Sequence, residues 1–179
     1  MATHLIIDGY NLLGVRGQMG RAQGIGAEAA REQLLRELVL YRQRKGHAIT
    51  VVFDGWQQGF ATGHREHRSG LEVVFSPRGQ RADQVIQRLA EEYQSDCAVV
   101  SSDREVSNSA RSHGAFVISA AEFESKLRGG EETRLTTKRG SYRPDRDAEE
   151  SQPRRHDKKG NPRKLPKALR QRNRQLRGF

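Results

Sequence analysis

Cysteine, long apolar runs and hydrophobic residues in general are scarce in this sequence of 179 residues. Cys97 is the only cysteine, so no disulfide can form within the chain, and its place in an apolar run predicts a buried thiol. No stretch approaches the roughly 20 apolar residues that are needed to span a bilayer. The first residues do not resemble a secretory signal, because Asp8 interrupts the only apolar run there. We therefore expect a cytoplasmic protein that has no membrane partner.

Charge is distributed unevenly along the chain. Residues 1–127 contain 15 basic and 15 acidic residues, and residues 128–152 contain six of each, so both regions are neutral. Residues 153–179 contain 11 basic residues and one acid, so this segment carries the whole net charge of +10. We expect a folded domain over residues 1–128 and a polar, solvated linker over residues 129–152.

Residues 153–179, the basic arm, have the composition of a nucleic-acid-binding tail. Such tails are usually disordered in isolation and bind nucleic acid through its phosphates. Leu165, Leu169 and Leu176 give a thin apolar stripe, which is compatible with a short helix that forms on a partner. Improved solubility is the alternative explanation, and the one-sided charge favours RNA or ribosome binding over it.

Three apolar segments each run into an aspartate, namely Asp8, Asp54 and Asp103. Short runs of Leu, Ile and Val are typical of strands that are buried in a parallel sheet. The carboxyl ends of parallel strands lie at one edge of the sheet, where open α/β sheets bind ligands, so we expect the three carboxylates to meet there. The alternative is that each aspartate only ends its strand or caps the next helix.

A fourth acid, Asp83, falls in the first turn of a helix that the spacing of apolar residues predicts over 82–93. Right-handed connections would start this helix at the same edge of the sheet as the strand-end acids. An acid in a first turn also interacts favourably with the helix dipole whatever its other role. Four acids at one edge favour a functional site over four separate caps.

The remaining elements alternate between strands and helices. Apolar runs predict further strands over residues 71–76 and 115–118. Apolar residues at spacings of three and four predict helices over residues 27–45, 82–93, 103–113 and 120–127, and Ser119 with Glu122 has the spacing of a capping box. This order predicts an α/β fold of three layers, with a mainly parallel sheet that helices cover on both faces.

Two polar segments match no known ligand-binding motif. Residues 12–26 contain five glycines together with Arg16 and Arg21, but neither the P-loop nor the dinucleotide-binding spacing of glycines. We favour a loop there, and the alternative is a flap that brings both arginines to a phosphate chain. Residues 57–70 contain a His-x-x-His pair without the nearby cysteines or acids that complete a zinc site, so we expect a solvated basic loop.

Clustered carboxylates suggest a particular kind of ion. Carboxylate oxygens are hard ligands, and several of them around one point select Mg²⁺ or Mn²⁺. Such an ion polarises a phosphodiester, lowers the pKa of the attacking water and offsets the mutual repulsion of the acids. The amide of Asn11 is placed to orient a ligand or a water, and Ser101 and Ser102 are placed to do the same at the far side.

Four motifs occur in order along the chain. They are Ile-Ile-Asp-Gly-Tyr-Asn-Leu-Leu at 6–13, Val-Val-Phe-Asp-Gly at 51–55, Arg-Ala-Asp at 81–83 and Val-Val-Ser-Ser-Asp-Arg-Glu-Val at 99–106. This set resembles the NYN domains of the YacP-like family, which belong to the PIN-like nuclease superfamily. The resemblance runs from about Leu5 to about Leu127, and the basic arm lies outside it. It implies a PIN-like Rossmannoid sheet and metal-dependent cleavage of RNA.

The resemblance also implies roles for individual residues. By motif, the catalytic acids are Asp8, Asp54, Asp83 and Asp103, with Asn11 beside the first. Among them we expect Asp8, Asp83 and Asp103 to be the ligands of Mg²⁺ or Mn²⁺. We further expect contacts with RNA from Ser101, Ser102, Arg16, Arg21 and Arg81. PIN-like domains often carry two adjacent acids where this chain has Asp83 and Gln84, so chemistry with a single ion stays open. YacP-like proteins are associated with ribosomes and messenger RNA cleavage, which the basic arm would suit.

We expect a metal-dependent endoribonuclease that acts on single-stranded or ribosome-bound RNA. One alternative is a non-catalytic RNA- or ribosome-binding protein with the same fold. A weaker alternative is a phosphatase of small nucleotides. A binding module has no need of four acids that repel RNA, and a small substrate has no need of a basic arm, so both features favour the nuclease.

Overall fold

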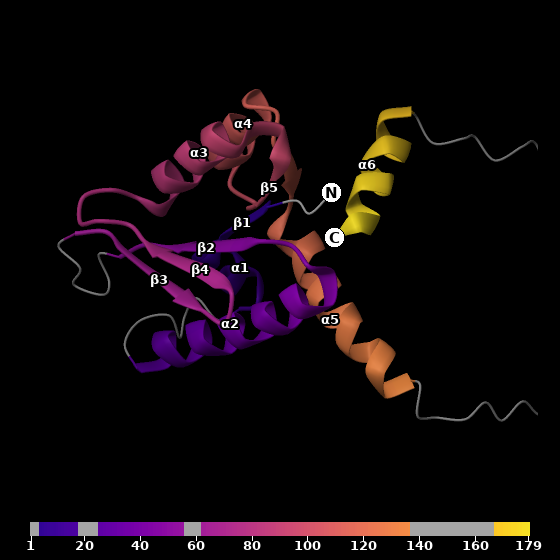
Figure 1. Ribbon diagram of the computed structural model, residues 1–179, viewed down its shortest axis with the longest axis horizontal. Helices are drawn as coiled ribbons and strands as arrows, with labels where there is room; N and C mark the ends of the chain where they lie inside the picture. Colours follow the sequence, from indigo (N-terminus) through magenta and orange to yellow (C-terminus); the bar gives the residue numbers. More distant parts are fainter. Residues whose placement is uncertain (1–3, 18–24, 56–61, 137–166) are drawn as a thin grey trace, which may run out of the picture. The chain divides into compact units, whose positions relative to one another are not determined.

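The computed structural model describes residues 4–17, 25–55, 62–136 and 167–179. A β-sheet forms the centre of the sheet domain in these ranges (Figure 1). Within these ranges the sheet has six strands. They are β1 (His4–Asp8), β2 (Ile49–Phe53), β3 (His64–Arg68), β4 (Leu71–Phe75), β5 (Cys97–Val100) and β6 (Phe116–Ile118). All but β3 consist mostly of buried apolar residues, which is why their apolar runs identify them in the sequence.

The strands follow the order β3-β4-β2-β1-β5-β6 across the sheet. All neighbours are parallel except β3 and β4, so the predicted mainly parallel sheet is confirmed. β1 lies at the centre, with Leu5 opposite Ile49 of β2 and Ala98 of β5. This register brings the carboxyl ends of β1, β2 and β5 to the same edge of the sheet.

Helices cover both faces of the sheet, as the α/β prediction requires. The helices in the described residues are α1 (Gly9–Val15), α2 (Ile25–Lys45), α3 (Ala82–Tyr93), α4 (Arg104–Ser112), α5 (Ala120–Thr136) and α6 (Lys167–Gly178). α3 and α4 pack on one face, where Val85 and Val106 join Ile6, Val52 and Val99 in a buried core. α1 and α2 lie on the other face, and the rings of Tyr41 on α2 and Phe123 on α5 meet at 5.2 Å (Figure 1).

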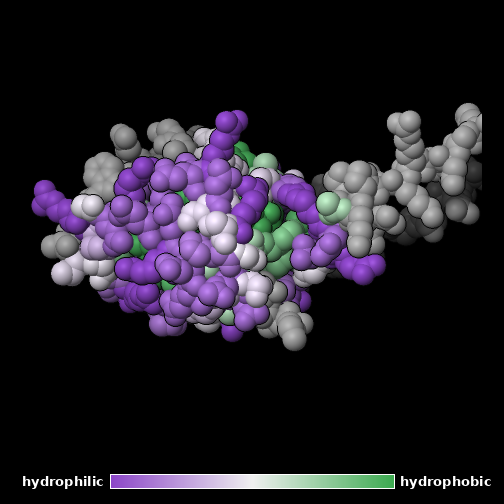
Figure 2. Space-filling model, turned by 90° about the horizontal axis from the view of Figure 1, so that it is seen from above, coloured by the Kyte–Doolittle hydropathy of each residue, from purple (hydrophilic) through white to green (hydrophobic). Residues whose placement is uncertain are grey.

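The outer surface of the α3 and α4 layer is mostly hydrophilic, as Figure 2 shows from that side. No helix in the residues that the structure describes combines the length and the apolar character that crossing a bilayer requires. This agrees with the absence of long apolar runs in the sequence.

The sequence predicts a basic loop over residues 57–70. This prediction is wrong for His64–Arg68, which form the edge strand β3. β3 pairs antiparallel with β4 through the two residues Ser69 and Gly70, whose φ angles are +49° and +84°. Positive φ at both central residues is the conformation of a two-residue hairpin turn. A polar strand is stable there because it is an edge strand with one neighbour, and the Ser-Gly pair is the signal that sequence reasoning missed.

Two helical boundaries also differ from the predictions. Residues 12–15, predicted as loop, belong to α1, because Asp8 caps the helix and Leu12 and Leu13 are buried. α5 continues through the glycine pair 129–130 to Thr136, although the sequence predicts its end at residue 127. Glycine costs about 1 kcal/mol within a helix, which weakens a helix without necessarily ending it.

The C-terminal segment contains a helix where disorder is predicted. Lys167–Gly178 form α6, so this part of the basic arm is helical in the structure. The other residues of the arm, 153–166, lie outside the described residues, as do residues 137–152 of the expected linker. The contacts between residues divide the chain into two compact units, Met1–Glu132 and Thr133–Phe179.

Candidate active site at the carboxyl edge of the sheet

Asp8 is the last residue of the central strand β1 and also the N-cap of α1. Its side chain is only 7% exposed. Oδ1 accepts a hydrogen bond from the backbone N–H of Asn11 at 3.0 Å, and Oδ2 accepts one from the hydroxyl of Ser101 at 3.2 Å. The carboxylate is therefore a helix cap, as the structural alternative proposed, and at the same time a fixed group at the sheet edge.

Gly9 allows β1 to turn directly into α1. A Cβ atom at this position would overlap the ring of Phe53, which is fully buried at the end of β2. Only glycine leaves room for that ring. The Asp8-Gly9 pair therefore holds the start of α1 against β2.

Polar side chains tie the end of β1 to the end of β5. The side-chain oxygen of Asn11 accepts from the backbone N–H of Ser102 at 2.9 Å, and the hydroxyl oxygen of Ser101 accepts from the N–H of Asp103 at 3.1 Å. The hydroxyl oxygen of Ser102 accepts from the N–H of Ala120, at the start of α5. Asn11, Ser101 and Ser102 thus hold the site together, which is a positioning role for the two serines predicted to contact RNA.

Asp54 follows β2 and fixes the start of α3. Its Oδ1 accepts from the N–H of Ala82 at 2.7 Å and lies 3.4 Å from the hydroxyl of Ser76, which donates to it. Because Ala82 is the first residue of α3, Asp54 positions the turn that carries Asp83. Ser76 is fully buried and also accepts from the N–H of Gly55. Sequence reasoning missed Ser76, although it follows an apolar strand just as the three acids do.

Asp103 caps α4, with Oδ1 accepting from the backbone N–H groups of Glu105 at 2.7 Å and Val106 at 3.3 Å. Asp83 forms an ion pair with Arg81 at 2.6 Å through its Oδ2. Within the described residues, Oδ2 of Asp103, Oδ2 of Asp54 and Oδ1 of Asp83 accept no hydrogen bond. Each of these three acids therefore keeps one carboxylate oxygen for a ligand.

Charge interactions connect the four acids through Asp83. Burial and, to a smaller extent, the negative charges of Asp83 and Asp54 raise the pKa of Asp8 to about 6, against the hydrogen bonds from Asn11 and Ser101 that lower it. Burial also raises the pKa of Asp83, and the charges of Asp103 and Asp54 add to this rise while Arg81 opposes it. The charges of Asp54 and Asp103 therefore act on Asp83, and those of Asp54 and Asp83 act on Asp8, while the joint role of the four acids as one site stays a prediction.

The described residues do not form a preformed metal-binding site. Among the side chains of the described ranges, no three His, Cys, Asp or Glu residues lie together as ligands of a single ion. The expectation that Asp8, Asp83 and Asp103 all bind one ion directly is thus not met by their positions here. Mg²⁺, however, usually keeps several waters and binds through one or two carboxylates together with substrate phosphates. The free carboxylate oxygens and the excess of negative charge fit that mode.

The three arginines predicted to contact RNA have different surroundings. Arg81 is 72% exposed and forms an ion pair with Asp83, so it lies at the site. Arg21 lies outside the described residues. Arg16 is buried, and two carboxylates bind its guanidinium, so the prediction that it binds RNA is wrong in this structure.

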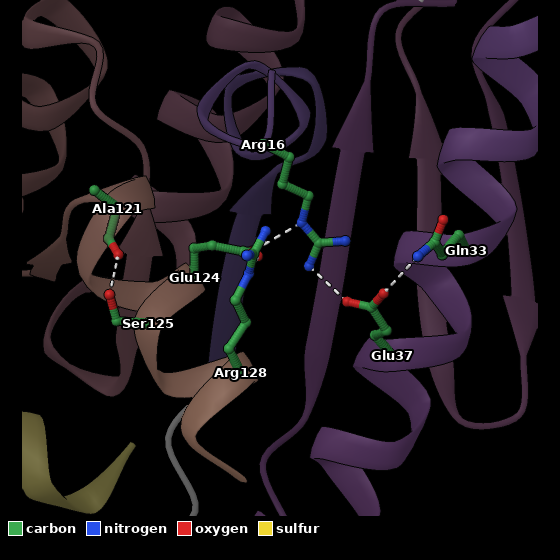
Figure 3. Close-up of polar contacts among 7 residues, drawn as sticks. All are labelled: Arg16, Gln33, Glu37, Ala121, Glu124, Ser125 and Arg128. Carbon is green, nitrogen blue, oxygen red and sulfur yellow. Dashed lines mark hydrogen bonds and ion pairs between the residues drawn. The ribbon is translucent and has the colours of Figure 1, made fainter. Parts of the chain in front are cut away.

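Figure 3 shows the surroundings of Arg16. Nη2 lies 2.6 Å from Glu37 on α2 and Nε lies 2.8 Å from Glu124 on α5, while the side chain is 4% exposed. Arg128 pairs with the other oxygen of Glu124 at 2.7 Å, and Gln33 donates to Glu37. The physical reason for the failed prediction is that both carboxylates already neutralise this arginine. It joins the end of α1 to α2 and α5.

Comparison with known proteins identifies the family and agrees with the fold. The profile of the family described as the YacP-like NYN domain matches residues 5–172. The match extends beyond Leu127, the limit to which the sequence motifs carry the resemblance, so it includes most of the basic arm. The chain is 32% identical over 88 residues to the uncharacterised protein YacP of Bacillus subtilis, strain 168, which is 49% of this chain and 51% of that protein. The chain thus matches about half the length of this curated relative.

Two crystal structures of Rae1 (YacP) from Bacillus subtilis are similar to this chain. One of them, the structure of a mutant in which a tryptophan is replaced by leucine, has a TM-score of 0.60 and 26% identity, over 76% of this chain and 85% of that chain. The other structure has the same TM-score and identity, over 74% of this chain and 79% of that chain. The likeness therefore covers about three quarters of this chain.

Proposed function

From the premise that this chain belongs to the YacP-like NYN domain family, of the PIN-like nuclease superfamily, we propose that it is a metal-dependent endoribonuclease that hydrolyses RNA phosphodiester bonds. The observation that carries this proposal is that Asp8, Asp54, Asp83 and Asp103 all lie at the carboxyl edge of the sheet, where the charges of Asp54 and Asp83 act on Asp8 and those of Asp54 and Asp103 act on Asp83. Within the described residues, Arg81 is the one cation that contacts an acid of this set. A binding module for RNA gains nothing from a group of acids that repels phosphate.

The free carboxylate oxygens of Asp54, Asp83 and Asp103 are the groups that would hold Mg²⁺ or Mn²⁺, next to the buried carboxylate of Asp8. When bound, such an ion polarises the phosphodiester and lowers the pKa of the attacking water. The chain itself keeps the acids in place: Ser101 and the N–H of Asn11 hold Asp8, and the N–H of Ala82 holds Asp54. This preorganisation keeps the acids fixed despite their mutual repulsion.

The basic arm supplies affinity for the RNA backbone in this proposal. Residues 153–179 contain 11 basic residues and one acid, and α6 has no acid in its first turn. Lys and Arg side chains bind phosphates and release counterions, which makes binding steeply dependent on salt. Ribosome-bound messenger RNA is the substrate that we infer, because a tail of this kind gains affinity from the dense phosphates of ribosomal RNA.

The test is cleavage of labelled RNA by wild type and by Asp103→Asn, with Mg²⁺, Mn²⁺ or chelator, and with or without ribosomes. Asparagine is as good an N-cap as aspartate, so α4 should keep its start while the site loses a charge. The matched control is Asp96→Asn, which removes an exposed carboxylate from the turn before β5. We expect loss of cleavage only in Asp103→Asn and in chelator. Equal cleavage by both variants would contradict the proposal.

A non-catalytic RNA- or ribosome-binding protein is the second candidate. The observation that favours it is the lack of three direct metal ligands together in the described residues, with Gln84 where PIN-like domains often have an acid. This candidate predicts that wild type binds RNA but cleaves nothing with any ion, with or without ribosomes. The same experiment therefore separates the two.

A further inference from the structure

Two arginine side chains that the structure describes, those of Arg16 and Arg31, are buried in the sheet domain, and they differ in how their charge is neutralised. Arg16 contacts two carboxylates, those of Glu37 and Glu124. Arg31, on the second turn of α2, is only 6% exposed and forms no ion pair with any carboxylate of the described residues. Burying a cation without a counter-charge is costly, so a buried arginine without a carboxylate calls for another explanation.

Among the described residues, Arg31 makes one hydrogen bond, in which Nη1 donates to the phenol oxygen of Tyr10 at 3.2 Å. A guanidinium carries five N–H donors, and this bond uses one of them. The fully buried side-chain nitrogens that lack a hydrogen bond in the described residues do not include any of Arg31. No nitrogen of this guanidinium is therefore both sealed from the surface and without a partner.

Tyr10 connects Arg31 to the acids. It is the second residue after Asp8, and its ring packs edge-on against Phe53 with the centroids 5.3 Å apart. Phe53 is the last residue of β2, directly before Asp54. The Tyr10 ring therefore lies between the ends of the two strands that carry Asp8 and Asp54. Since α2 leads into the amino end of β2, its first turns lie at the same carboxyl edge of the sheet.

We propose that Arg31, held by the hydroxyl of Tyr10, binds a backbone phosphate of the RNA next to the scissile one. This deepens the proposed nuclease function and rests on it. Arginine binds phosphate oxygens through two parallel N–H groups, and the phosphate supplies the counter-charge that the protein does not. A cation at this position also offsets the repulsion between the acids and the incoming RNA. Because the Tyr10 oxygen accepts from Arg31, its own proton is free to donate to the same phosphate.

The first experiment measures binding of a labelled single-stranded oligoribonucleotide in chelator, where no cleavage occurs. We expect Arg31→Gln to weaken binding about 10-fold, because a hydrogen-bonded charge contact is lost. Arg36→Gln is the control, since it removes the same charge from an exposed position on the same helix. Equal affinities of the two variants would overturn the proposal. This readout holds whether or not the protein cleaves RNA, so it is separate from the test of the nuclease.

A second experiment locates the contact on the RNA. A single methylphosphonate linkage is moved along the oligonucleotide, which removes one phosphate charge at a time. For wild type we expect one linkage at which affinity falls about 10-fold, and for Arg31→Gln no fall at that linkage. An identical pattern of losses in both proteins would overturn the proposal.

A third comparison separates this contact from a purely structural role. Tyr10→Phe keeps the ring on Phe53 and removes the hydroxyl, and Arg31→Lys keeps a charge but not the two parallel N–H groups. We expect both variants to raise KM for RNA about threefold or more while kcat stays near that of wild type, and thermal melting to show folded proteins. Unchanged KM in both variants would overturn the proposal.

Discussion

Two groups of acidic side chains in the same domain differ in how far basic side chains neutralise their charge. Around Arg16, the acids Glu37 and Glu124 face two arginines, so negative and positive charges balance. At the carboxyl edge of the sheet, Asp8, Asp54, Asp83 and Asp103 meet with Arg81 as the one contacting cation in the described residues. We call the first the balanced cluster and the second the acidic cluster.

From this difference we propose that the balanced cluster serves stability and the acidic cluster serves function. The balanced cluster joins α1 to α2 and α5 and leaves no buried charge without a partner (Figure 3). In the acidic cluster, burial and, after it, the like charges of neighbouring acids raise the pKa values of Asp8 and Asp83, an arrangement that costs stability unless a cation binds. Perturbed carboxylates of this kind are typical of functional sites.

The largest expected effect is on catalysis. We expect Asp83→Asn to lower the rate of RNA cleavage by at least about 100-fold, because it removes charge from the acidic cluster where the reaction needs it. Glu37→Gln, in the balanced cluster, should leave the rate close to that of wild type at temperatures where both are folded. Rates of labelled RNA cleavage measure this. A similar loss in both variants would remove the functional distinction between the clusters.

The next effect is on stability and concerns the balanced cluster. We expect Arg16→Met to lower the free energy of unfolding by about 3 kcal/mol, because it removes the buried guanidinium that joins Glu37 and Glu124. Arg128→Met is the control, since this side chain is 69% exposed and its ion pair should contribute at most about 0.5 kcal/mol. Urea denaturation measures both. Equal losses of stability in the two variants would show that the buried ion pairs of Arg16 contribute no more than the exposed ion pair of Arg128.

The acidic cluster should respond in the opposite direction. We expect Asp8→Asn to raise the free energy of unfolding at pH 8, in chelator, by up to about 3 kcal/mol, since the rise in pKa from 3.8 to about 6 measures the cost of the buried charge. Oδ1 of the asparagine still accepts from the N–H of Asn11. Asp96→Asn should change stability little. A large loss of stability in Asp8→Asn would show that its hydrogen bonds outweigh the repulsion.

The pH dependence follows from the same pKa. In the folded protein Asp8 holds its proton up to about pH 6, whereas in the unfolded chain it loses the proton near the ordinary pKa of an aspartate, 3.8. The folded state therefore binds more protons between these values, and the contribution of Asp8 to stability falls as pH rises from about 4 to about 6. We expect the difference in stability between Asp8→Asn and wild type to grow over this range and to be constant above it. A difference that does not change with pH would contradict the raised pKa.

The smallest expected effect is the stabilisation that a bound divalent cation gives to the acidic cluster. Mg²⁺ or Mn²⁺ at about ten times its dissociation constant should stabilise wild type by about 1.4 kcal/mol. Asp54→Asn should reduce this gain, and Glu37→Gln should not, because only the acidic cluster is free to bind the ion. Thermal melting with and without the ion measures the shift. An equal shift in both variants would place the ion elsewhere.

Much of the fold could be predicted because each element carries its own signal. The apolar runs of β1, β2, β4 and β5 and the apolar spacing of α3 depend on neighbours in sequence. The capping box of α5 is likewise local, and the hydroxyl of Ser119 and the carboxylate of Glu122 form it as expected. β3 could not be predicted from hydrophobicity, because a polar edge strand owes its stability to pairing with β4.

Two features can be read directly from the amino-acid sequence. Four acids follow or adjoin apolar strands, and the net positive charge lies in the C-terminal segment. Three features could be seen only in the folded structure. Arg16 is neutralised by Glu37 and Glu124, and Arg31 forms a hydrogen bond with Tyr10 and no ion pair with a described carboxylate. Asp8 is buried where the charges of Asp54 and Asp83 act on it. The physical reason is that strand and helix signals arise from neighbours along the chain. The charge that a side chain experiences depends on its neighbours in space, and these come from segments that are far apart in the sequence.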